Sequence, residues 1–319
     1  MALPSSGTIS VSDILAEGGV AAGTTTALSR LEAGSIFTIN TASPSYPVGD
    51  PPHSLSEWYS YDHSATSWSN DYALDYDGVN DYVRGSITGS IPNRTFTVSM
   101  WVRIDATTKH NMSFYSFVGT AGTITNDRLL IYYAASLNRL IVQFRRGSDG
   151  AQYIQAYPLH DSGNATVSGV TNSSTGWVAS QRGNTDAQGF THLCFAIDQT
   201  QSSAANGIET YWNGNNLPYS VNNTSTCNTG LNCNYMSIGD NPSSSTAPST
   251  PMEGVIDEVY LYSSQLSSTN VSTIYGYGRH NENTFTTNYV TSWRMENTVA
   301  DDSGYVSLTN NGATFITAP

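Results

Sequence analysis

Hydrophobic and polar positions alternate along several stretches of the chain between about residue 70 and residue 262. The clearest is FTVSMWVRI, where the residues on one side are Phe96, Val98, Met100, Val102 and Ile104. A period of two is typical of a half-buried antiparallel strand. The same period predicts further strands over 128–134, 139–145, 191–198, 207–214 and 254–262. These stretches together indicate an antiparallel β-sandwich.

Turn and helix signals separate the predicted strands. Asn213-Gly214 lies between two β stretches and is the dipeptide that a hairpin turn with positive φ favours. The segments 161–189 and 240–251 are rich in Ser, Asn, Gly and Pro, and we expect them to be loops at the ends of the sandwich. One short helix is predicted near the C-terminal part, with Ser267 or Ser268 as its cap, an apolar stripe of Val271, Ile274 and Tyr275, and Gly276 as its end.

Residues 1–65 follow a different pattern and are predicted to form a small irregular module with short helices, before a second domain over residues 66–319. Ser10 and Asp13 have the spacing of a capping box, which predicts a helix over 13–17. A second helical stretch is expected over 26–34, and Ser54 opens a further turn. Because these elements are small, we expect no core of their own and a fold completed against a partner. The apolar residues expected to dock are Leu3, Pro4, Ile9, Val11, Ile14 and Leu15.

Composition excludes two classes of protein. Charged residues make up 12% of the 319 residues, where about 25% is typical, and the formal net charge is −13. A nucleic-acid-binding protein needs a basic stripe, so we expect no nucleic-acid partner. Mean hydropathy is −0.30 and no apolar run approaches about 20 residues, so no membrane span is expected. The opening MALPSSGTIS lacks the basic and apolar regions of a secretory signal, which predicts synthesis in a cytoplasm without export.

Five segments follow one another in a characteristic order. They are ALDYDGVNDYV (73–83), FTVSMWVRI (96–104), GIETYWNGNNLPYS (207–220), MSIGDN (236–241) and MEGVIDEVYLYSSQLSSTNVSTIYGYG (252–278). Their order resembles the laminin-G-like, concanavalin-A-like jelly-roll domains that are related to pentraxins, over roughly residues 70–280. The resemblance implies an all-β fold, an antiparallel jelly-roll β-sandwich. It implies no single function, because lectins, hydrolases and adhesive modules share this fold.

The N-terminal module carries a second resemblance. LPSSGTISVSDILAEGG (3–19) and SLSEWYSYDH (54–63) resemble a segment of bacteriophage virion proteins that precedes a variable distal domain. This resemblance implies docking to a capsid, neck or tail protein, and assembly of the virion in the host cytoplasm. With no long shaft between the two parts, a head or tail appendage is expected rather than a full tail fibre. Homo-oligomerisation is expected as well, because the short N-terminal elements lack a predicted core.

We expect no enzymatic activity from this sequence. A glycosidase needs two carboxylates that face each other across a cleft. Asp257 and Glu258 are adjacent in a predicted strand and should point to opposite faces, and Glu253 lies about 13 Å from Asp257 along the strand. Asp257 and Glu258 are expected to make structural hydrogen bonds instead. The six histidines show no metal-ligand spacing. A depolymerase acting on capsular polysaccharide remains the enzymatic alternative.

Binding of host-surface polysaccharide is the expected function of the exposed domain. Aromatic faces combined with amide and hydroxyl groups recognise sugars, and the chain is rich in all three. The candidate residues are Trp177, Trp212, Tyr219, Asp240 and Asn241, with Tyr132, Tyr133 and Tyr153 as further aromatics. Aromatic residues in strands also pack cores and interfaces, so a ligand-free capsid cement protein remains an alternative.

No cofactor is predicted, with calcium kept as an alternative. Oxygen-bearing clusters that suit Ca²⁺ are Asp77, Asn80 and Asp81, then Asp240 with Asn241, and Asp301 with Asp302. The same residue types are ordinary in turns, where they cap their own backbone. Cys194 is predicted as a core residue, while Cys227 and Cys233 could close a small loop in an oxidising environment.

Overall fold

The chain divides into two compact units, Met1–Ser69 and Asn70–Pro319. The structure is a computed structural model that describes residues 3–39, 54–61, 63, 70–87, 94–105, 111–119, 127–134, 139–145, 152–158, 188–201, 207–217, 220–224, 233–242, 249–279 and 283–317. Each unit has its own hydrophobic core.

The first unit contains three short helices, α1 (Val11–Glu17), α2 (Leu28–Glu32) and the 3-10 helix η1 (Leu55–Trp58). The predicted capping box begins α1: Asp13 N–H donates to Ser10 Oγ at 3.3 Å, and Ser10 N–H donates to the Asp13 carboxylate at 2.7 Å. This reciprocal pair satisfies backbone donors that the first turn leaves open. The helix therefore begins at Val11, before the predicted residue 13.

The first unit encloses a hydrophobic core, which corrects the expectation that it has none. The buried members are Leu3, Ile9, Ile14, Leu15, Leu31, Trp58 and Tyr61. The Trp58 and Tyr61 rings meet edge to face with centroids 5.0 Å apart, and Leu3 N–H donates to the Tyr61 carbonyl at 2.8 Å. The prediction failed because the capping pattern identified the elements but not the aromatic residues that bring the two ends of the unit together.

The expected docking residues are therefore largely interior. Leu3, Ile9, Ile14 and Leu15 are buried in this core, Val11 is half-buried, and Pro4 is exposed. Side chains that fill a unit's own core stabilise that unit and cannot contact a partner without unfolding it.

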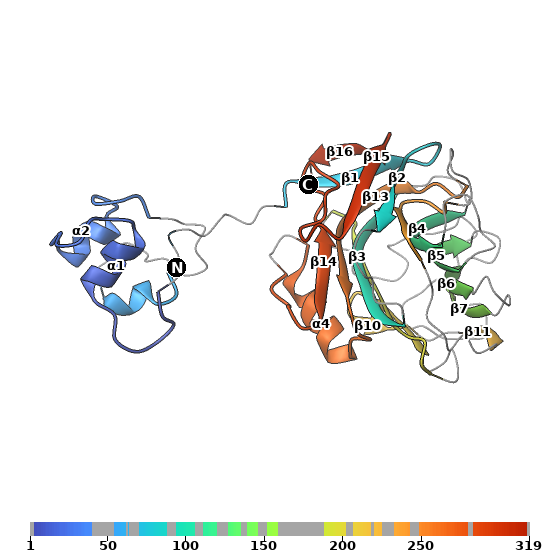
Figure 1. Cartoon of the computed structure of the whole chain (residues 1–319), viewed down its shortest axis with the longest axis horizontal. Coiled ribbons are helices and arrows are strands. Elements are labelled where there is room, and N and C mark those ends of the chain that lie inside the picture. The colour runs from blue at the N-terminus through green and yellow to red at the C-terminus, as the bar shows by residue number, and fades with distance from the viewer. Residues whose placement is uncertain are drawn as a thin grey trace. The chain divides into compact units, whose positions relative to one another are not determined.

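The second unit is a sandwich of two eight-stranded sheets, confirming the predicted jelly-roll β-sandwich (Figure 1). In sheet A the order is β10 (Asn215–Asn216), β9 (Ile208–Trp212), β8 (Thr191–Asp198), β3 (Thr95–Ile104), β13 (Glu253–Tyr262), β1 (Tyr72–Asp77) and β16 (Thr314–Thr317), and β14 (Tyr289–Trp293) also pairs with β13. In sheet B the order is β11 (Ser220–Thr224), β7 (Gln152–Pro158), β6 (Arg139–Arg145), β5 (Arg128–Ala134), β4 (Met112–Val118), β12 (Tyr235–Ile238), β2 (Tyr82–Ile87) and β15 (Val306–Asn311). Neighbouring strands run antiparallel throughout.

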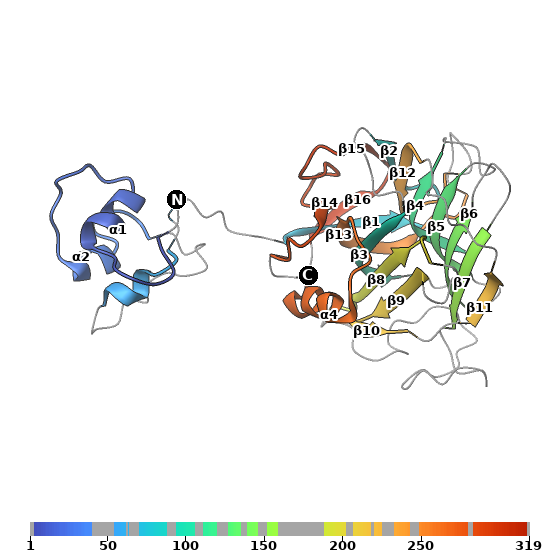
Figure 2. The same ribbon diagram turned by 60° about the horizontal axis from the view of Figure 1, so that its bottom comes forward.

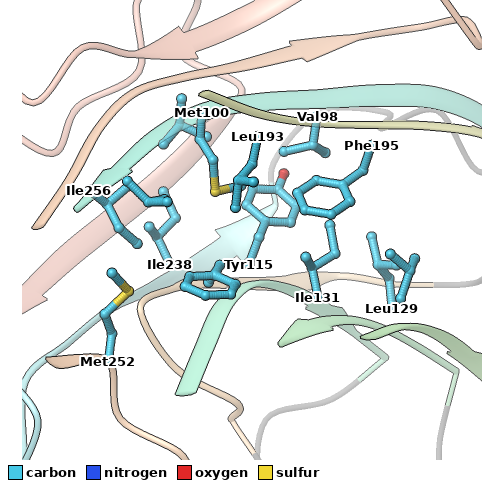
Figure 3. Close-up of a cluster of buried hydrophobic side chains, with 14 of the residues drawn as sticks. Val98, Met100, Tyr115, Leu129, Ile131, Leu193, Phe195, Ile238, Met252 and Ile256 are labelled. Atoms are coloured by element: carbon cyan, nitrogen blue, oxygen red, sulfur yellow. The ribbon is translucent and has the colours of Figure 1, made fainter. Parts of the chain in front are cut away.

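The main core lies between the two sheets (Figure 3). Sheet A contributes alternate residues such as Val98, Met100 and Leu193, and sheet B contributes Leu129 and Ile131. The inward residues of β3 are those that the period of two predicted. Alternation works here because each strand has one face against the opposite sheet.

The predicted hairpin and helix are both present. Asn213 and Gly214 have φ of 49° and 74°, which is the geometry of the tight turn between β9 and β10. Helix α4 (Ser268–Tyr277) has Ser267 as its N-cap, and the helix ends at Tyr277 before Gly278 rather than at Gly276. Among the described helices, none is long and apolar enough to cross a membrane.

Candidate ligand-binding face

The outer face of sheet A is covered by its own chain. Helix α4 lies on the side of sheet A that faces away from sheet B (Figure 2). Val271 and Ile274 of this helix share a buried cluster with Tyr260 and Tyr262 of β13. The Tyr275 ring stacks on Trp101 of β3, with centroids 5.8 Å apart. Because these contacts bury the outward side chains of sheet A, a ligand would have to reach the sandwich elsewhere.

Asp240, which follows β12, lies against Arg84 of β2 and Ser116 of β4 in sheet B. The Asp240 carboxylate accepts hydrogen bonds from Arg84 Nε at 2.7 Å and from Ser249 N–H at 3.1 Å. Ser113 N–H donates to the Thr250 carbonyl at 3.0 Å, which ties Thr250 to the start of β4. Burial raises the pKa of Asp240, and the Arg84 guanidinium acts in the opposite direction.

This arrangement corrects the expected role of Asp240. Its side chain is fully buried and forms an ion pair with Arg84, so it does not lie at a loop rim. The neighbouring Asn241 is half-buried, and its backbone carbonyl accepts from Ser249 Oγ at 2.9 Å. Asp240 therefore anchors a loop on the sheet.

The aromatic residues predicted to bind a sugar lie partly in the core and partly on the outer face of sheet B. Trp212 belongs to β9 and is 5% exposed in the main core, so its ring is no platform for a sugar and that expectation is corrected. Tyr133 is likewise in the core, whereas Tyr132 points outward and is half-buried. Trp177 and Tyr219 lie outside the described residues, as does the side chain of Tyr153.

The part of sheet B that carries half-buried polar side chains is the outer face of β5 and β6, which we call the β5–β6 face. It is defined by four residues: Arg128, Tyr132, Gln143 and Arg145. Their neighbours Leu129, Ile131 and Phe144 point into the core, so alternation places the four on the opposite side. Arg128 Nη2 donates to Gln143 Oε1 at 3.1 Å.

The β5–β6 face offers hydrogen-bond donors and an aromatic ring on a sheet that is fixed by its ladder. Arg128 lies directly opposite Arg145, and Tyr132 lies opposite Ile141. Guanidinium and amide groups bind the hydroxyl and anionic groups of a sugar, and a tyrosine ring packs on its apolar side. These polar groups border the buried outward residues Leu130, Ala134 and Ile141, and among the described residues the β5–β6 face holds no carboxylate for acid–base chemistry.

The sequence reasoning missed Arg128, Gln143 and Arg145. The predicted sugar-binding residues were aromatic residues, an aspartate and an asparagine, and did not include arginine or glutamine within strands. A usable signal existed: the stretches 128–134 and 139–145 begin or end with arginine and put polar residues on the face away from the apolar positions.

The two other calcium candidates engage their own backbone. Asp77 Oδ1 accepts from Val79 N–H at 2.8 Å and from Asn80 N–H at 3.2 Å, which is a turn cap, and Asp81 accepts from Asp77 N–H at 2.9 Å. Asp302 accepts from Ser292 N–H at 3.0 Å. In the described part of the chain, no group of three or more His, Cys, Asp or Glu side chains is placed to hold a metal ion.

A β-bulge corrects the expected geometry of Asp257 and Glu258. Asp257 pairs with Trp101 and Tyr260 pairs with Ser99, so β13 has one residue more than β3 at this point, and Glu258 takes a φ of 50°. The alternation is reset there, and Glu258 accepts a hydrogen bond from the Tyr260 hydroxyl on the outer face. Both carboxyl groups therefore lie on the outer side of sheet A, not on opposite faces.

The surroundings of these two carboxyl groups are structural, as the hydrogen bonds show. Asp257 accepts from Asn70 Nδ2 at 3.0 Å and from Arg279 Nη1 at 3.2 Å. Burial raises the pKa of Asp257 to about 7, and Asn70 and Arg279 oppose this shift. Burial, and then the nearby Asp257, raise the pKa of Glu258 well above its usual range. Both side chains are almost fully buried, so neither faces a substrate in this structure.

Ser99, His192 and Cys194 are buried in the sandwich. Ser99 Oγ and His192 Nε2 lie 2.7 Å apart, and burial lowers the pKa of His192 to about 3. Cys194 is a buried free thiol in a satellite cluster under α4, and Cys233 is a half-buried free thiol. Cys227 lies outside the described residues. None of Ser99, His192 and Cys194 is therefore exposed to solvent.

No protein-family model matches the sequence, and no curated protein matches it. Solved structures resemble the chain in fold. A native heptameric SAP-like pentraxin from Limulus polyphemus is 12% identical with a TM-score of 0.48, covering 78% of this chain and 96% of the pentraxin. A candidate carbohydrate-binding protein from Bacteroides ovatus ATCC 8483 is 15% identical with a TM-score of 0.49, covering 79% and 61%. The CBM40 of the Ruminococcus gnavus IT-sialidase, bound to alpha2,3 sialyllactose, is 11% identical with a TM-score of 0.42, covering 66% and 100%.

Proposed function

We propose that the protein is a non-enzymatic adhesion protein whose sandwich binds surface polysaccharide through the β5–β6 face. The observation that carries the proposal is the contrast between the two sheets. Sheet A has its outer face covered by α4, whereas on sheet B Arg128, Tyr132, Gln143 and Arg145 stay half-buried beside the buried outward residues Leu130, Ala134 and Ile141. Such rigid placement of a few polar groups beside an aromatic ring suits recognition of a sugar.

We propose further that this adhesion serves a bacteriophage virion. The support is the similarity of residues 3–19 and 54–63 to N-terminal segments of virion proteins, together with a first unit that has its own core. Docking to a capsid, neck or tail protein would then use the exposed surface of that unit, because Ile14 and Leu15 are interior. Weak sugar contacts repeated around a symmetric particle would add up to firm attachment. Homo-oligomerisation is also part of the proposal. A missing core in the first unit is not the reason for it, because that unit has a core of its own.

Binding of the purified full-length chain to an array of bacterial surface glycans tests the adhesion role. We expect binding that Tyr132→Ala weakens and that Tyr72→Ala leaves unchanged, since Tyr72 is a half-buried tyrosine on sheet A. Absence of binding to every glycan would overturn adhesion and favour a cement protein. Release of reducing sugar from a bound polysaccharide would overturn the non-enzymatic assignment and favour the depolymerase alternative.

Particle incorporation tests the docking role separately. Because the two units have separate cores, a chain that begins at Asn70 should retain a folded sandwich. We expect this shortened chain to bind glycan like the full chain and to be absent from purified particles. Normal incorporation of the shortened chain would contradict docking by the first unit.

A further inference from the structure

Several edges of the two sheets have features that hinder pairing with another chain. At β14, Asp302 N–H donates to the Ser292 carbonyl at 3.1 Å, and Ser292 N–H donates to the Asp302 carboxylate at 3.0 Å. The edge strand β10 is two residues long and lies beside α4 (Figure 2). The edge strand β11 pairs with β7 in a register that shifts between Val221 and Asn223. Covered, short and bulged edges are the means by which natural sheets avoid pairing with a further strand.

The strands β15 and β16 form an edge without these features, which we call the β15–β16 edge. Among the described strands, β15 is the last of sheet B and β16 is the last of sheet A. β15 pairs with β2 in unbroken register over Val306–Asn311, and β16 pairs with β1 over Thr314–Thr317. Neither strand contains a charged residue or a proline. Because alternate residues of an edge strand direct their N–H and C=O groups away from the sheet, this edge can pair with another strand.

The side chains of the β15–β16 edge also suit a further strand. Leu308 of β15 and Phe315 of β16 belong to different sheets, and both are half-buried against the main core. Ser307 and Thr309 alternate with Leu308 and are exposed. A strand added beside β15 would bury more of Leu308 and would meet hydroxyl groups, which hydrogen-bond between neighbouring strands.

The distribution of charge favours a second copy of this chain as the occupant. The chain has a net charge of −13, so two copies repel each other over most of their surface. Residues 303–319 contain no Asp, Glu, Lys, Arg or His. When this edge meets itself, no like charges come to lie opposite each other, which would destabilise a sheet. A strongly charged partner strand, in contrast, would find no opposite charge on these strands.

We propose that two copies of the chain associate through the β15–β16 edge, with β15 of one copy antiparallel to β15 of the other. This inference rests on the homo-oligomerisation in the proposed function and assigns a surface to it. The contact uses the same strand on both copies and therefore closes at a dimer with two-fold symmetry. Because the two-fold axis between antiparallel strands of one sheet is perpendicular to that sheet, both copies present the outer face of sheet B on the same side.

Sedimentation equilibrium of the purified full-length chain over a range of concentrations tests this inference. We expect a monomer and a dimer in exchange. Ser307→Lys/Thr314→Lys adds one lysine at an exposed position of each edge strand. It should raise the dissociation constant of the dimer about tenfold, because lysines of the two copies then face each other across the contact.

Hydrogen exchange of the natural chain tests the same contact without a variant that has to fold. We expect the exchange of Val306–Asn311 to slow as the protein concentration rises, because the outward amides of β15 gain partners in the dimer. The exchange of Ser268–Tyr277 in α4 should not depend on concentration. Exchange of Val306–Asn311 that is independent of concentration, in a chain that dimerises, would overturn the β15 contact.

Thr269→Lys/Thr273→Lys is the matched control, because it adds the same charge at two exposed positions of α4. It should leave the dissociation constant unchanged. Equal weakening by this control, a dimer that Ser307→Lys/Thr314→Lys leaves intact, or a trimer would overturn the β15–β16 edge but leave homo-oligomerisation. A chain that stays monomeric at every concentration would overturn both, and the glycan array would still test adhesion separately.

Discussion

The two buried aspartates Asp240 and Asp257 differ in how completely their carboxylates are paired. Arg84 and Asp240 form an ion pair that is almost fully buried, with further donors from the backbone. Asp257 meets Arg279 and Asn70, but its second carboxylate oxygen has no hydrogen-bond partner among the described residues. A buried charge is costly unless its partners satisfy it, so the two sites should respond differently to substitution.

At Asp240 the expected effect is on stability. Asp240→Asn would leave the buried Arg84 guanidinium without its counter-charge, and we predict a loss of about 3–5 kcal/mol in the free energy of unfolding. Urea denaturation of the full chain measures this loss in the transition of the sandwich. The double variant Arg84→Met/Asp240→Leu should recover much of the stability, because it removes both charges. A loss below about 1 kcal/mol for Asp240→Asn would contradict the buried pair.

At Asp257 the expected effect is on the pH dependence of stability. The unfolded carboxyl titrates near 3.8 and the folded one near 7, so between these values the folded state keeps a proton that the unfolded chain has lost. Stability from this group is therefore fully present below pH 4 and is lost as pH rises through 7, on the order of a few kcal/mol. Asp257→Asn should flatten this decline, measured by urea denaturation at pH 5 and pH 8.

Asp302→Asn is the control for that titration. Hydrogen bonds from Tyr289 and Ser292 lower the pKa of Asp302 despite its partial burial. Its contribution to stability is present above pH 4 and lost on acidification, which is the opposite sign. Asp302→Asn should therefore leave the decline between pH 5 and pH 8 in place. An unchanged decline in Asp257→Asn would show that another group causes it.

At the scale of elements, the bulge in β13 is a place where the hydrophobic pattern does not predict on which side of the sheet a residue lies. Period-two alternation identified the strands β3, β5, β6, β8 and β13, because every second residue packs into the core. It failed at Glu258, which takes a positive φ although it is not glycine. Nothing local in GVIDEVYLY marks the extra residue, since the bulge depends on how β3 pairs along β13.

The pairing of β2 with β15 depends on one glycine. A Cβ at Gly85 would lie 1.9 Å from the backbone oxygen of Ser307, so a side chain there would push the two strands apart. Gly85 has no positive φ, and the reason for glycine is close approach of the neighbouring strand. We predict that Gly85→Ala lowers the free energy of unfolding by about 1–3 kcal/mol. It should also raise the amide hydrogen exchange of Val306–Asn311.

Gly276→Ala makes a matched control in the same unit. Gly276 lies within α4, and a Cβ there would meet no atom within 4 Å. Alanine should stabilise the helix by up to about 1 kcal/mol, because it restricts the unfolded chain and favours helix. If Gly85→Ala were as stable as the natural chain, β15 would have to pair with β2 less closely than the structure shows.

At the scale of the whole molecule, the sandwich was far more predictable than the site. The sandwich follows from a pattern repeated in many strands, so an error at one strand leaves the class unchanged. The site depends on which outward face is covered, and that is decided by contacts between distant segments such as α4 with β13. Sequence alone could not show that Trp212 is interior while Tyr132 is outward.

Because the two units have separate cores, a substitution that destabilises one core should unfold that unit and leave the other unit folded. Ile14 is fully buried in the first unit, and Ile14→Ala should cost about 2–5 kcal/mol. A core within fewer than about 70 residues rarely supplies more than about 3–5 kcal/mol, so this variant should leave the first unit largely unfolded. Hydrogen exchange of the full chain should show lost protection over Val11–Glu17 and unchanged protection over Thr95–Ile104.

Val11→Ala, at a half-buried position, is the control and should keep the protection of both segments. Retained protection in Ile14→Ala would contradict a core built around Ile14, and lost protection in Thr95–Ile104 would contradict separate cores.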